Sequence, residues 1–198
     1  MPDPSRHQMF LVRHAQTGWS RGGRHTGRTD VALLPEGRAA ATALAGLLAS
    51  HRFALVLTSP LQRAQDTCDL CGFGHLADGD ADLAEWDYGD YEGLTTEEIR
   101  TERPGWTLWA DGVPGGETAA DVGRRADRVI ARARSAPGDT LCFSHGHLLR
   151  VLAARWVGLP PAAGRIAVLS PGSFSVLGWE REVPVIARWN AAVPGRPG

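Results

Sequence analysis

The chain has 198 residues, of which 43% are hydrophobic and 22% charged, and its formal net charge is −1. These values are typical of a globular protein, and we expect one domain over residues 1–198 with flexible ends at 1–7 and 192–198. The near-neutral charge argues against a nucleic-acid partner, and no apolar run approaches the ~18 residues of a membrane helix. The N-terminal sequence lacks the layout of a signal peptide, so we expect a cytoplasmic protein.

The hydrophobic pattern predicts strands and helices that alternate along most of the chain. In chain order, the expected strands lie at 10–12, 54–57, 140–143, 166–169, 174–177 and 183–189. The expected helices lie at 35–49, after residue 59, at 95–100, at 118–133 and at 148–157. Such alternation indicates a three-layer α/β/α fold with a mostly parallel central sheet. The last two strands are typical of a hairpin at a sheet edge.

Capping residues mark where two of these helices begin. Ser59 and Gln62 stand three residues apart, as in a capping box, and Thr118 with Asp121 can cap the later helix. The residues at 72–94 are rich in Gly and Asp, which predicts a long irregular segment.

Residues that suit a phosphate follow three of the predicted strands. Arg13 and His14 follow the first strand, Arg63 lies one turn inside the helix after the second, and His145 follows the strand at 140–143. Ligands of open parallel sheets bind at the carboxyl ends of the strands, so these side chains can meet in one crevice. Guanidinium groups bind phosphoryl oxygens in pairs, a helix N-terminus adds N–H donors, and neutral imidazole is a nucleophile. Together they predict a phosphoryl-binding site.

A metal site is the competing interpretation, because His14, His145 and His147 could all be ligands. Their neighbours are arginines, however, and these would repel a divalent cation. Cys68 and Cys71 form a C-x-x-C pair inside a helical pattern without a second pair, which favours buried apolar side chains over a zinc site. We therefore expect neither a metal nor a cofactor.

Several stretches resemble the motifs of the histidine phosphatase superfamily, the phosphoglycerate mutase-like proteins. They are LVRHAQTGW, HTGRTDVALLPEGRAAA, TSPLQRAQDT and FSHGHLLR, which follow the family's order over residues 9–152. The segment LAEWDYG resembles the family's acidic segment, in which a glutamate donates a proton. Two positions depart from the family pattern: Ala15 and His147 replace the usual glycines after the two histidines.

The resemblance implies a role for each of these residues. His14 would attack phosphorus and form a phosphohistidine, while Glu85 would protonate the leaving oxygen and later activate water. The phosphoryl oxygens would be held by Arg13, Arg63 and His145. Substrate binding would also involve Ser20, Thr26, Gly27, Tyr88 and His147. The aromatic side chains of Trp86, Tyr88, Trp106 and Trp109 could form either an apolar rim around the substrate or part of the core.

A phosphatase fits better than a mutase. Family mutases carry an Arg after the acidic Glu and a Lys soon after the Tyr-Gly pair, whereas here Trp86 follows Glu85 and all 21 basic residues are Arg. The stretch EWDYGDYEGL resembles the branch of broad-specificity acid phosphatases and sugar-bisphosphate phosphatases, which implies a small phosphorylated metabolite as substrate. A catalytically silent phospho-ligand-binding member would have lost His14 or Glu85. The apolar C-terminal strands could form the edge of a homodimer or only close the sheet.

Overall fold

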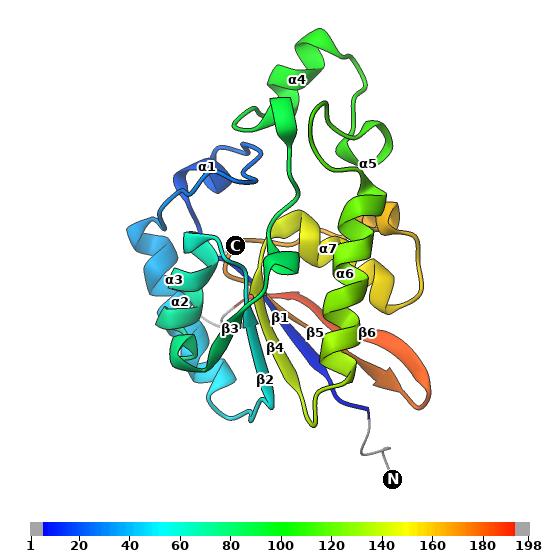
Figure 1. Cartoon of the computed structure of the whole chain (residues 1–198). Coiled ribbons are helices and arrows are strands. Elements are labelled where there is room, and N and C mark those ends of the chain that lie inside the picture. The colour runs from blue at the N-terminus through cyan, green and yellow to red at the C-terminus, as the bar shows by residue number, and fades with distance from the viewer. Residues whose placement is uncertain (1–5, 193–198) are drawn as a thin grey trace.

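The computed structural model describes residues 6–192, and its centre is a six-stranded sheet in the order β3-β2-β4-β1-β5-β6 (Figure 1). The strands are β1 (Met9–Arg13), β2 (Leu55–Thr58), β3 (Ala77–Gly79), β4 (Thr140–Ser144), β5 (Phe174–Glu180) and β6 (Val183–Ala191). Strands β1 to β4 pair in parallel, and β5 and β6 add an antiparallel hairpin. The predicted flexible ends lie mostly outside the described residues.

Helices cover both faces of this sheet, as the alternating pattern predicted (Figure 1). They are α1 (Gly18–Arg21), α2 (Pro35–Leu48), α3 (Gln62–Leu70), α4 (Thr96–Glu102), α5 (Leu108–Asp111), α6 (Ala119–Arg134) and α7 (Gly146–Trp156). Helices α2 and α3 lie on one face, α6 and α7 on the other, and α4 and α5 rise above the sheet. Within residues 6–192, short 3-10 turns lie at Gly74–Leu76, Ala81–Leu83, Gly89–Tyr91 and Pro161–Ile166.

Strand β1 shows why the three layers form. Its side chains alternate between the two faces, so Phe10 and Val12 pack in the cluster that contains α2 and α3 residues. Met9 and Leu11 pack in the cluster that contains α6 and α7 residues. All four side chains are at most 3% exposed, which makes β1 a two-sided strand typical of a parallel sheet.

Two sequence expectations were wrong. Residues 166–169 do not form a strand; the 3-10 turn Pro161–Ile166 ends there, and the side chains of Ile166 and Val168 are exposed rather than packed in the core. The segment at 72–94 contains the short edge strand β3. Its last two residues, Asp78 and Gly79, are exposed and not apolar, so the hydrophobic pattern did not predict a strand there. The short helix α1, which was not expected from the sequence, begins with a capping box between Thr17 and Ser20.

The capping box expected at Ser59 is also wrong. Helix α3 begins at Gln62 with Leu61 as its N-cap, and the Asp30 carboxylate accepts from the Gln62 N–H at 2.9 Å. The Ser59 hydroxyl instead bonds to Nε2 of His145 at 2.7 Å. The box at Thr118 and Asp121, by contrast, is confirmed.

The parallel register brings three strand ends to one edge of the sheet. Arg13 pairs with Ser144, and Thr58 pairs with Phe143. The His14 N–H donates to the Ser144 carbonyl at 2.8 Å, which continues the ladder into the residue after β1. The residues that follow β1, β2 and β4 are therefore neighbours, although they are far apart in sequence.

Candidate active site

His14 presents one ring nitrogen to a cavity of about 350 Å³ at this edge of the sheet. Its Nδ1 lies 2.8 Å from the Ala15 carbonyl, which can only accept, so Nδ1 carries the proton and Nε2 keeps its lone pair. Burial first, and then the charges of Arg13 and Arg63, lower the pKa of His14 well below its usual range. His14 is thus neutral and oriented, as a nucleophile requires.

The methyl group of Ala15, at the position where the family has glycine, fits without distortion. It is fully buried in a small cluster with Leu33 and Ala41. The Ala15 N–H donates to the Thr67 hydroxyl at 3.0 Å, and that hydroxyl donates to the Arg63 carbonyl at 2.7 Å. Helix α3 therefore fixes the backbone on which His14 stands.

Arg63 lies beneath the wall of the cavity rather than in its lining. Its side chain is fully buried and donates to the carbonyls of Thr26, Gly27 and Thr29 at 2.9, 3.0 and 2.9 Å. Its Nε donates to Nδ1 of His145 at 3.2 Å. Arg63 thus places a positive charge under the site and ties α3 to the loop that follows α1.

His145 is held at both ring nitrogens. Because Nδ1 accepts from Arg63, Nε2 carries the proton and donates it to Ser59. Burial first, and then the charge of Arg63, lower the pKa of His145 well below its usual range. Its ring centroid lies 5.2 Å from that of His14, so the two predicted histidines are together.

Glu85 reaches the same cavity from the irregular segment before α4. Its carboxylate accepts from the N–H groups of His147 at 3.0 Å and Leu148 at 2.9 Å, and from Trp86 at 3.0 Å. The first two groups are unpaired donors in the first turn of α7, whose N-cap His145 makes no side-chain bond there. Glu85 supplies the missing cap, which explains how a loop residue takes a defined place beside α7.

Arg13 lines the cavity and is anchored at one edge only. Its Nη1 donates to the Leu169 carbonyl, whereas its buried Nε has no partner among the described residues. An unpaired buried donor is costly unless a ligand satisfies it. The arrangement is what a phosphoryl-binding arginine needs before its ligand arrives.

The further residues that the resemblance assigns to substrate binding divide into two groups. Ser20, Thr26, Tyr88 and His147 line the cavity, whereas Gly27 lines a separate hollow on the other side of Glu85. The Tyr88 hydroxyl lies 2.6 Å from Nδ1 of His147. Burial raises the pKa of Tyr88 well above its usual range, so the hydroxyl keeps its proton and donates it.

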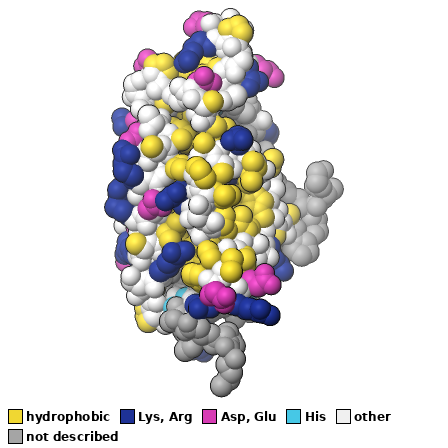
Figure 2. All heavy atoms as spheres, turned by 90° about the vertical axis from the view of Figure 1, so that its right-hand side faces the viewer, with side chains coloured by type: hydrophobic (Ala, Val, Ile, Leu, Met, Phe, Trp, Pro, Cys, Tyr) yellow, Lys and Arg dark blue, Asp and Glu magenta, His cyan; other side chains and the backbone are white. Residues whose placement is uncertain are grey.

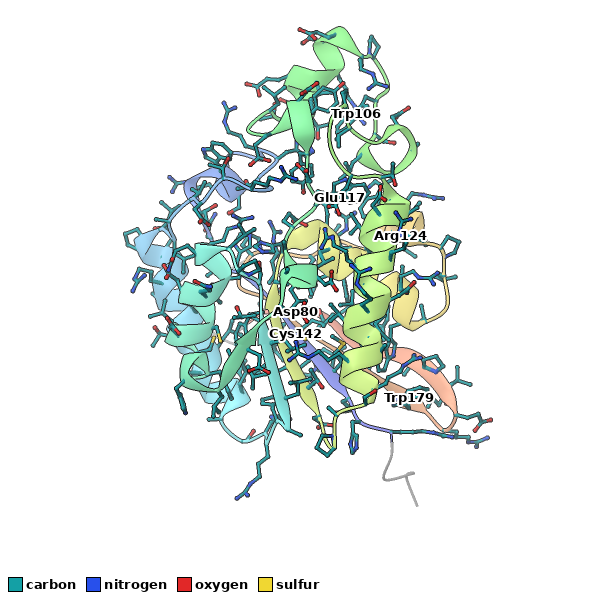
Figure 3. The ribbon with its side chains drawn as sticks, viewed as in Figure 1. Asp80, Trp106, Glu117, Arg124, Cys142 and Trp179 are labelled. Carbon is teal, nitrogen blue, oxygen red and sulfur yellow. The ribbon has the colours of Figure 1, made fainter. Side chains whose placement is uncertain are left out.

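The aromatic residues serve both as core and as rim. Trp86 is fully buried, and its Nε1 donates to the Glu117 carbonyl at 2.8 Å. Trp106 and Trp109 line the cavity from the segment that includes α4 and α5, and Trp106 lies above the sheet edge (Figure 3). That segment covers the site.

Sequence reasoning missed four residues of the lining, which are the arginines Arg24, Arg100 and Arg150 and the histidine His25. Arg100 donates to the Trp106 carbonyl at 2.8 Å, and Arg150 donates to the Gly164 carbonyl at 3.0 Å. The guanidinium carbon of Arg150 also lies 4.6 Å from the Trp109 ring centroid. Arg150 stands three residues after His147, so helical spacing could have revealed it. Arg24, His25 and Arg100 have no regular spacing from the predicted site residues that could have revealed them.

Gly146 gives a test of how closely Arg13 is packed. A Cβ at Gly146 would lie 3.2 Å from the Arg13 guanidinium carbon, closer than an ordinary contact. We expect Gly146→Ala to push this group aside and lower kcat/KM by about tenfold, because the displaced side chain loses aligned hydrogen bonds to the substrate. Gly46→Ala, in the open interior of α2, is the matched control: its Cβ meets nothing within 4 Å, so activity should not change. Steady-state kinetics of both variants check this; unchanged kcat/KM for Gly146→Ala would contradict it.

A family model of the histidine phosphatase superfamily (branch 1) matches residues 9–192. An acid phosphatase of Mycobacterium tuberculosis is 41% identical over 185 residues, which is 91% of each chain. A sedoheptulose 1,7-bisphosphatase of Saccharomyces cerevisiae is 38% identical over 184 residues, covering 76% of this chain and 67% of that protein. A solved structure of an open reading frame product from Mycobacterium tuberculosis has a TM-score of 0.89 at 40% identity, covering 94% of this chain and 98% of that chain.

The chain therefore belongs to the histidine phosphatase superfamily, and it is a phosphatase. Within residues 6–192, no cluster of three or more His, Cys, Asp or Glu side chains could hold a metal ion. No helix in this part of the chain is long and apolar enough to cross a membrane.

Proposed function

We propose that the protein is a metal-independent phosphomonoester hydrolase that acts on a small phosphorylated metabolite through a phosphohistidine on His14. The observation that carries this proposal is the unpaired Nε2 of a neutral His14 in the cavity that Arg13 and Glu85 also line. A nucleophile, a cation and a proton donor are the three groups that such a reaction needs.

In the first step, the Nε2 lone pair attacks phosphorus, and the bond from phosphorus to the substrate oxygen breaks. Glu85 gives its proton to that oxygen, so the product leaves as a neutral alcohol. The imidazole becomes positively charged, and the Nδ1–H bond to the Ala15 carbonyl stabilises it. Arg13 binds the transferring group directly, while Arg63 and His145 support the site from below.

In the second step, water attacks the phosphohistidine. The Glu85 carboxylate takes one proton from the water, and the bond between phosphorus and Nε2 breaks. The electron pair returns to His14, inorganic phosphate leaves, and Glu85 is again protonated. The arginines supply the positive charge that a metal ion supplies in other phosphatases.

The lining of the cavity supports an anionic metabolite as the substrate. It includes Arg13, Arg24, Arg100 and Arg150, whereas Glu85 is its one carboxylate within the described chain. A volume of about 350 Å³ falls at the lower end of small-molecule sites and exceeds what a phosphoryl group alone needs. The relatives named as an acid phosphatase and a sedoheptulose 1,7-bisphosphatase also favour this class of substrate.

Metal independence has a direct test. We expect hydrolysis of an aryl phosphate at an unchanged rate after dialysis against a chelator, because the charge stabilisation comes from arginines. The rate is measured before chelation, after it, and after addition of Mg²⁺, Mn²⁺ or Zn²⁺. A rate that falls with chelator and returns with one of these ions would contradict the proposal.

A mutase would have to hold a phosphoglycerate for transfer to its other oxygen. The residue after Glu85 offers no charge for this, since Trp86 is fully buried in the core. We expect phosphoglycerate to be hydrolysed rather than isomerised, with or without bisphosphoglycerate, and NMR of the products measures the ratio. Isomerisation that outpaces hydrolysis would favour a mutase. A catalytically silent protein would release no phosphate from any of a panel of phosphorylated metabolites compared by kcat/KM.

The cytoplasmic location and a homodimer edge remain predictions. Figure 2 shows hydrophobic side chains gathered on the face beside the hairpin. Among the described residues, the exposed large hydrophobic side chains of the C-terminal part include Ile166, Val168, Val183 and Ile186. Light scattering of the purified protein would report the number of copies.

A further inference from the structure

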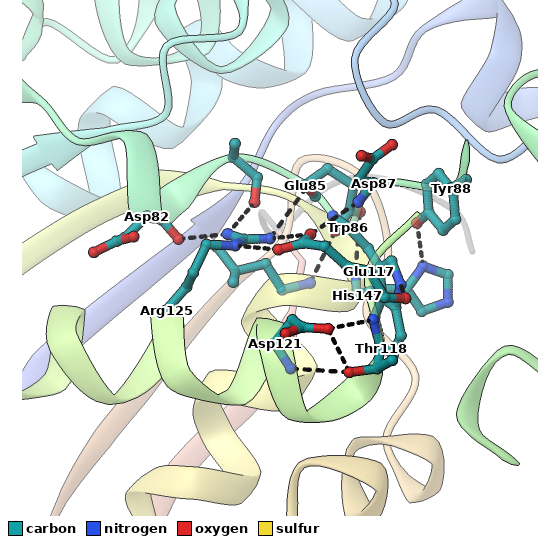
Figure 4. Close-up of polar contacts among 12 residues, drawn as sticks. Asp82, Glu85, Trp86, Asp87, Tyr88, Glu117, Thr118, Asp121, Arg125 and His147 are labelled. Carbon is teal, nitrogen blue, oxygen red and sulfur yellow. Dashed lines mark hydrogen bonds and ion pairs between the residues drawn. The ribbon is translucent and has the colours of Figure 1, made fainter. Parts of the chain in front are cut away.

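Arg125 lies in the middle of a polar cluster beside Glu85 (Figure 4). It comes from α6, and its side chain is only 13% exposed. Its Nη1 donates to the carbonyls of Asp82 at 2.7 Å and Ala84 at 2.9 Å, and its Nη2 donates to the Glu85 carbonyl at 3.3 Å. One guanidinium group thus binds the backbone on which the Glu85 side chain stands.

Glu117 binds both Arg125 and the backbone that follows Glu85. Its carboxylate accepts from Nε and Nη2 of Arg125 at 2.8 and 2.7 Å, and from the Asp87 N–H at 3.0 Å. Its carbonyl accepts from Nε1 of Trp86. The pair therefore binds backbone on both sides of Glu85 and the side chain that follows it.

The end of α6 makes this pair rigid. Thr118, the residue after Glu117, is the N-cap of α6, and it forms a reciprocal capping box with Asp121. Arg125 stands on the second turn of the same helix. Both members of the pair are thus fixed by one helix, while the residues they hold belong to an irregular segment.

A proton donor on an irregular segment needs such support. Proton transfer requires the donor and acceptor atoms to approach within about 3 Å, and small displacements cost rate steeply. The N–H groups at the start of α7 fix the position of the Glu85 carboxylate. The backbone of Glu85, however, lies between two short 3-10 turns and not in a helix or strand. The bidentate contact between Arg125 and Glu117 supplies the geometric constraint that the local backbone lacks.

We propose that Arg125, paired with Glu117, is a positioning residue for the Glu85 proton donor. This inference rests on the proposed function, in which Glu85 protonates the leaving oxygen. Arg125 lines the separate hollow on the far side of Glu85, not the substrate cavity, so it acts through Glu85 and does not touch the substrate.

The leaving group separates this role from a merely structural one. A nitrophenolate leaves without help, whereas an alkoxide needs the proton that Glu85 supplies. The measured quantity is kcat/KM, which reports the steps up to departure of the leaving group. A misplaced proton donor lowers kcat/KM for an alkyl phosphate far more than for an aryl phosphate. A partly unfolded enzyme loses both in equal proportion.

The experiment compares 4-nitrophenyl phosphate with glycerol phosphate for four variants and the wild type. Glu85→Gln sets the full effect of a lost proton donor, which we expect to be about a hundredfold or more on the alkyl ester. Arg125→Met should show the same preference, with a loss at least about tenfold larger on the alkyl than on the aryl ester. Arg125→Lys keeps the charge but not the fork of donors, so it should fall between Arg125→Met and wild type.

Arg128→Met is the matched control. Arg128 lies on the same helix and also contacts Asp82, but through the carboxylate and not the backbone carbonyl. We expect it to leave both esters unchanged. Equal losses on the two esters for Arg125→Met and Arg125→Lys, or no loss, would overturn the inference even where Glu85→Gln discriminates. If Glu85→Gln itself shows no discrimination, the assignment of Glu85 in the proposed function fails instead.

Discussion

Replacement of His14 by Ala is expected to lower kcat/KM for every phosphomonoester by roughly ten thousandfold or more, as loss of the nucleophile does in other covalent mechanisms. The two histidines at the start of α7, His145 and His147, offer no free ring lone pair in its place. His145 has both ring nitrogens engaged, by Arg63 and Ser59, and Nδ1 of His147 accepts from Tyr88. The variant should still fold, because among the described residues the His14 side chain bonds only to the carbonyl of Ala15.

The assay uses an aryl phosphate, whose leaving group makes the fewest demands on the enzyme. Circular dichroism and a thermal melt show that the variant is folded. His75→Ala, at an exposed position on a short 3-10 turn, is the matched control and should keep the wild-type rate. A folded His14→Ala protein that retains more than about a tenth of wild-type kcat/KM would remove His14 from the nucleophile's role.

Replacement of Arg63 by Met is expected to damage both catalysis and stability. It leaves the carbonyls of Thr26, Gly27 and Thr29 without their donor and removes the positive charge beside the proposed phosphoryl site. A buried carbonyl left without its donor typically costs about 1–3 kcal/mol, and three carbonyls lose their donor here. We expect the free energy of unfolding to fall by that order, and kcat/KM to fall by a hundredfold or more, roughly the effect of losing one charge-stabilising donor.

Arg63→Lys sharpens this prediction. A lysine keeps the charge, but its single ammonium group cannot reach three carbonyls and the His145 ring in the geometry of a guanidinium fork. It should therefore regain little activity. Arg38→Met, an exposed arginine of α2 in a loose ion pair with Asp66, is the control for loss of a charge. Wild-type kcat/KM in Arg63→Lys, together with an unchanged urea midpoint, would show that the charge alone matters.

The strand ends could be predicted because buried strands give a strong local signal. The apolar run before Arg13 identified β1, and the rule that ligands meet the carboxyl ends of parallel strands brought Arg13, His14 and His145 together. The register of β1 with β4 then confirmed that these ends are neighbours. The hairpin of β5 and β6 was readable for the same reason, since its residues have strand propensity and a turn between them.

Contacts that depend on distant backbone could not be predicted. The Ser59 hydroxyl fits a helix cap by local rules, yet it serves His145, and Asp30 takes over at the helix start. The family resemblance pointed to Glu85, but no sequence pattern shows that α7 would use its carboxylate as a cap. Arg125 lies forty residues further along the chain, and only the packing of α6 brings it beside Glu85.

Trapping the phosphoenzyme tests the central claim most directly. Wild type and Glu85→Gln are mixed with an aryl phosphate and quenched under alkaline conditions within the first turnover, because phosphohistidine survives base and decays in acid. The account predicts one added phosphoryl group on the peptide that contains His14, in larger amount for Glu85→Gln, where Glu85 no longer activates water, and none in His14→Ala. A phosphoryl group on another residue, or none while phosphate is released in the first turnover, would contradict it.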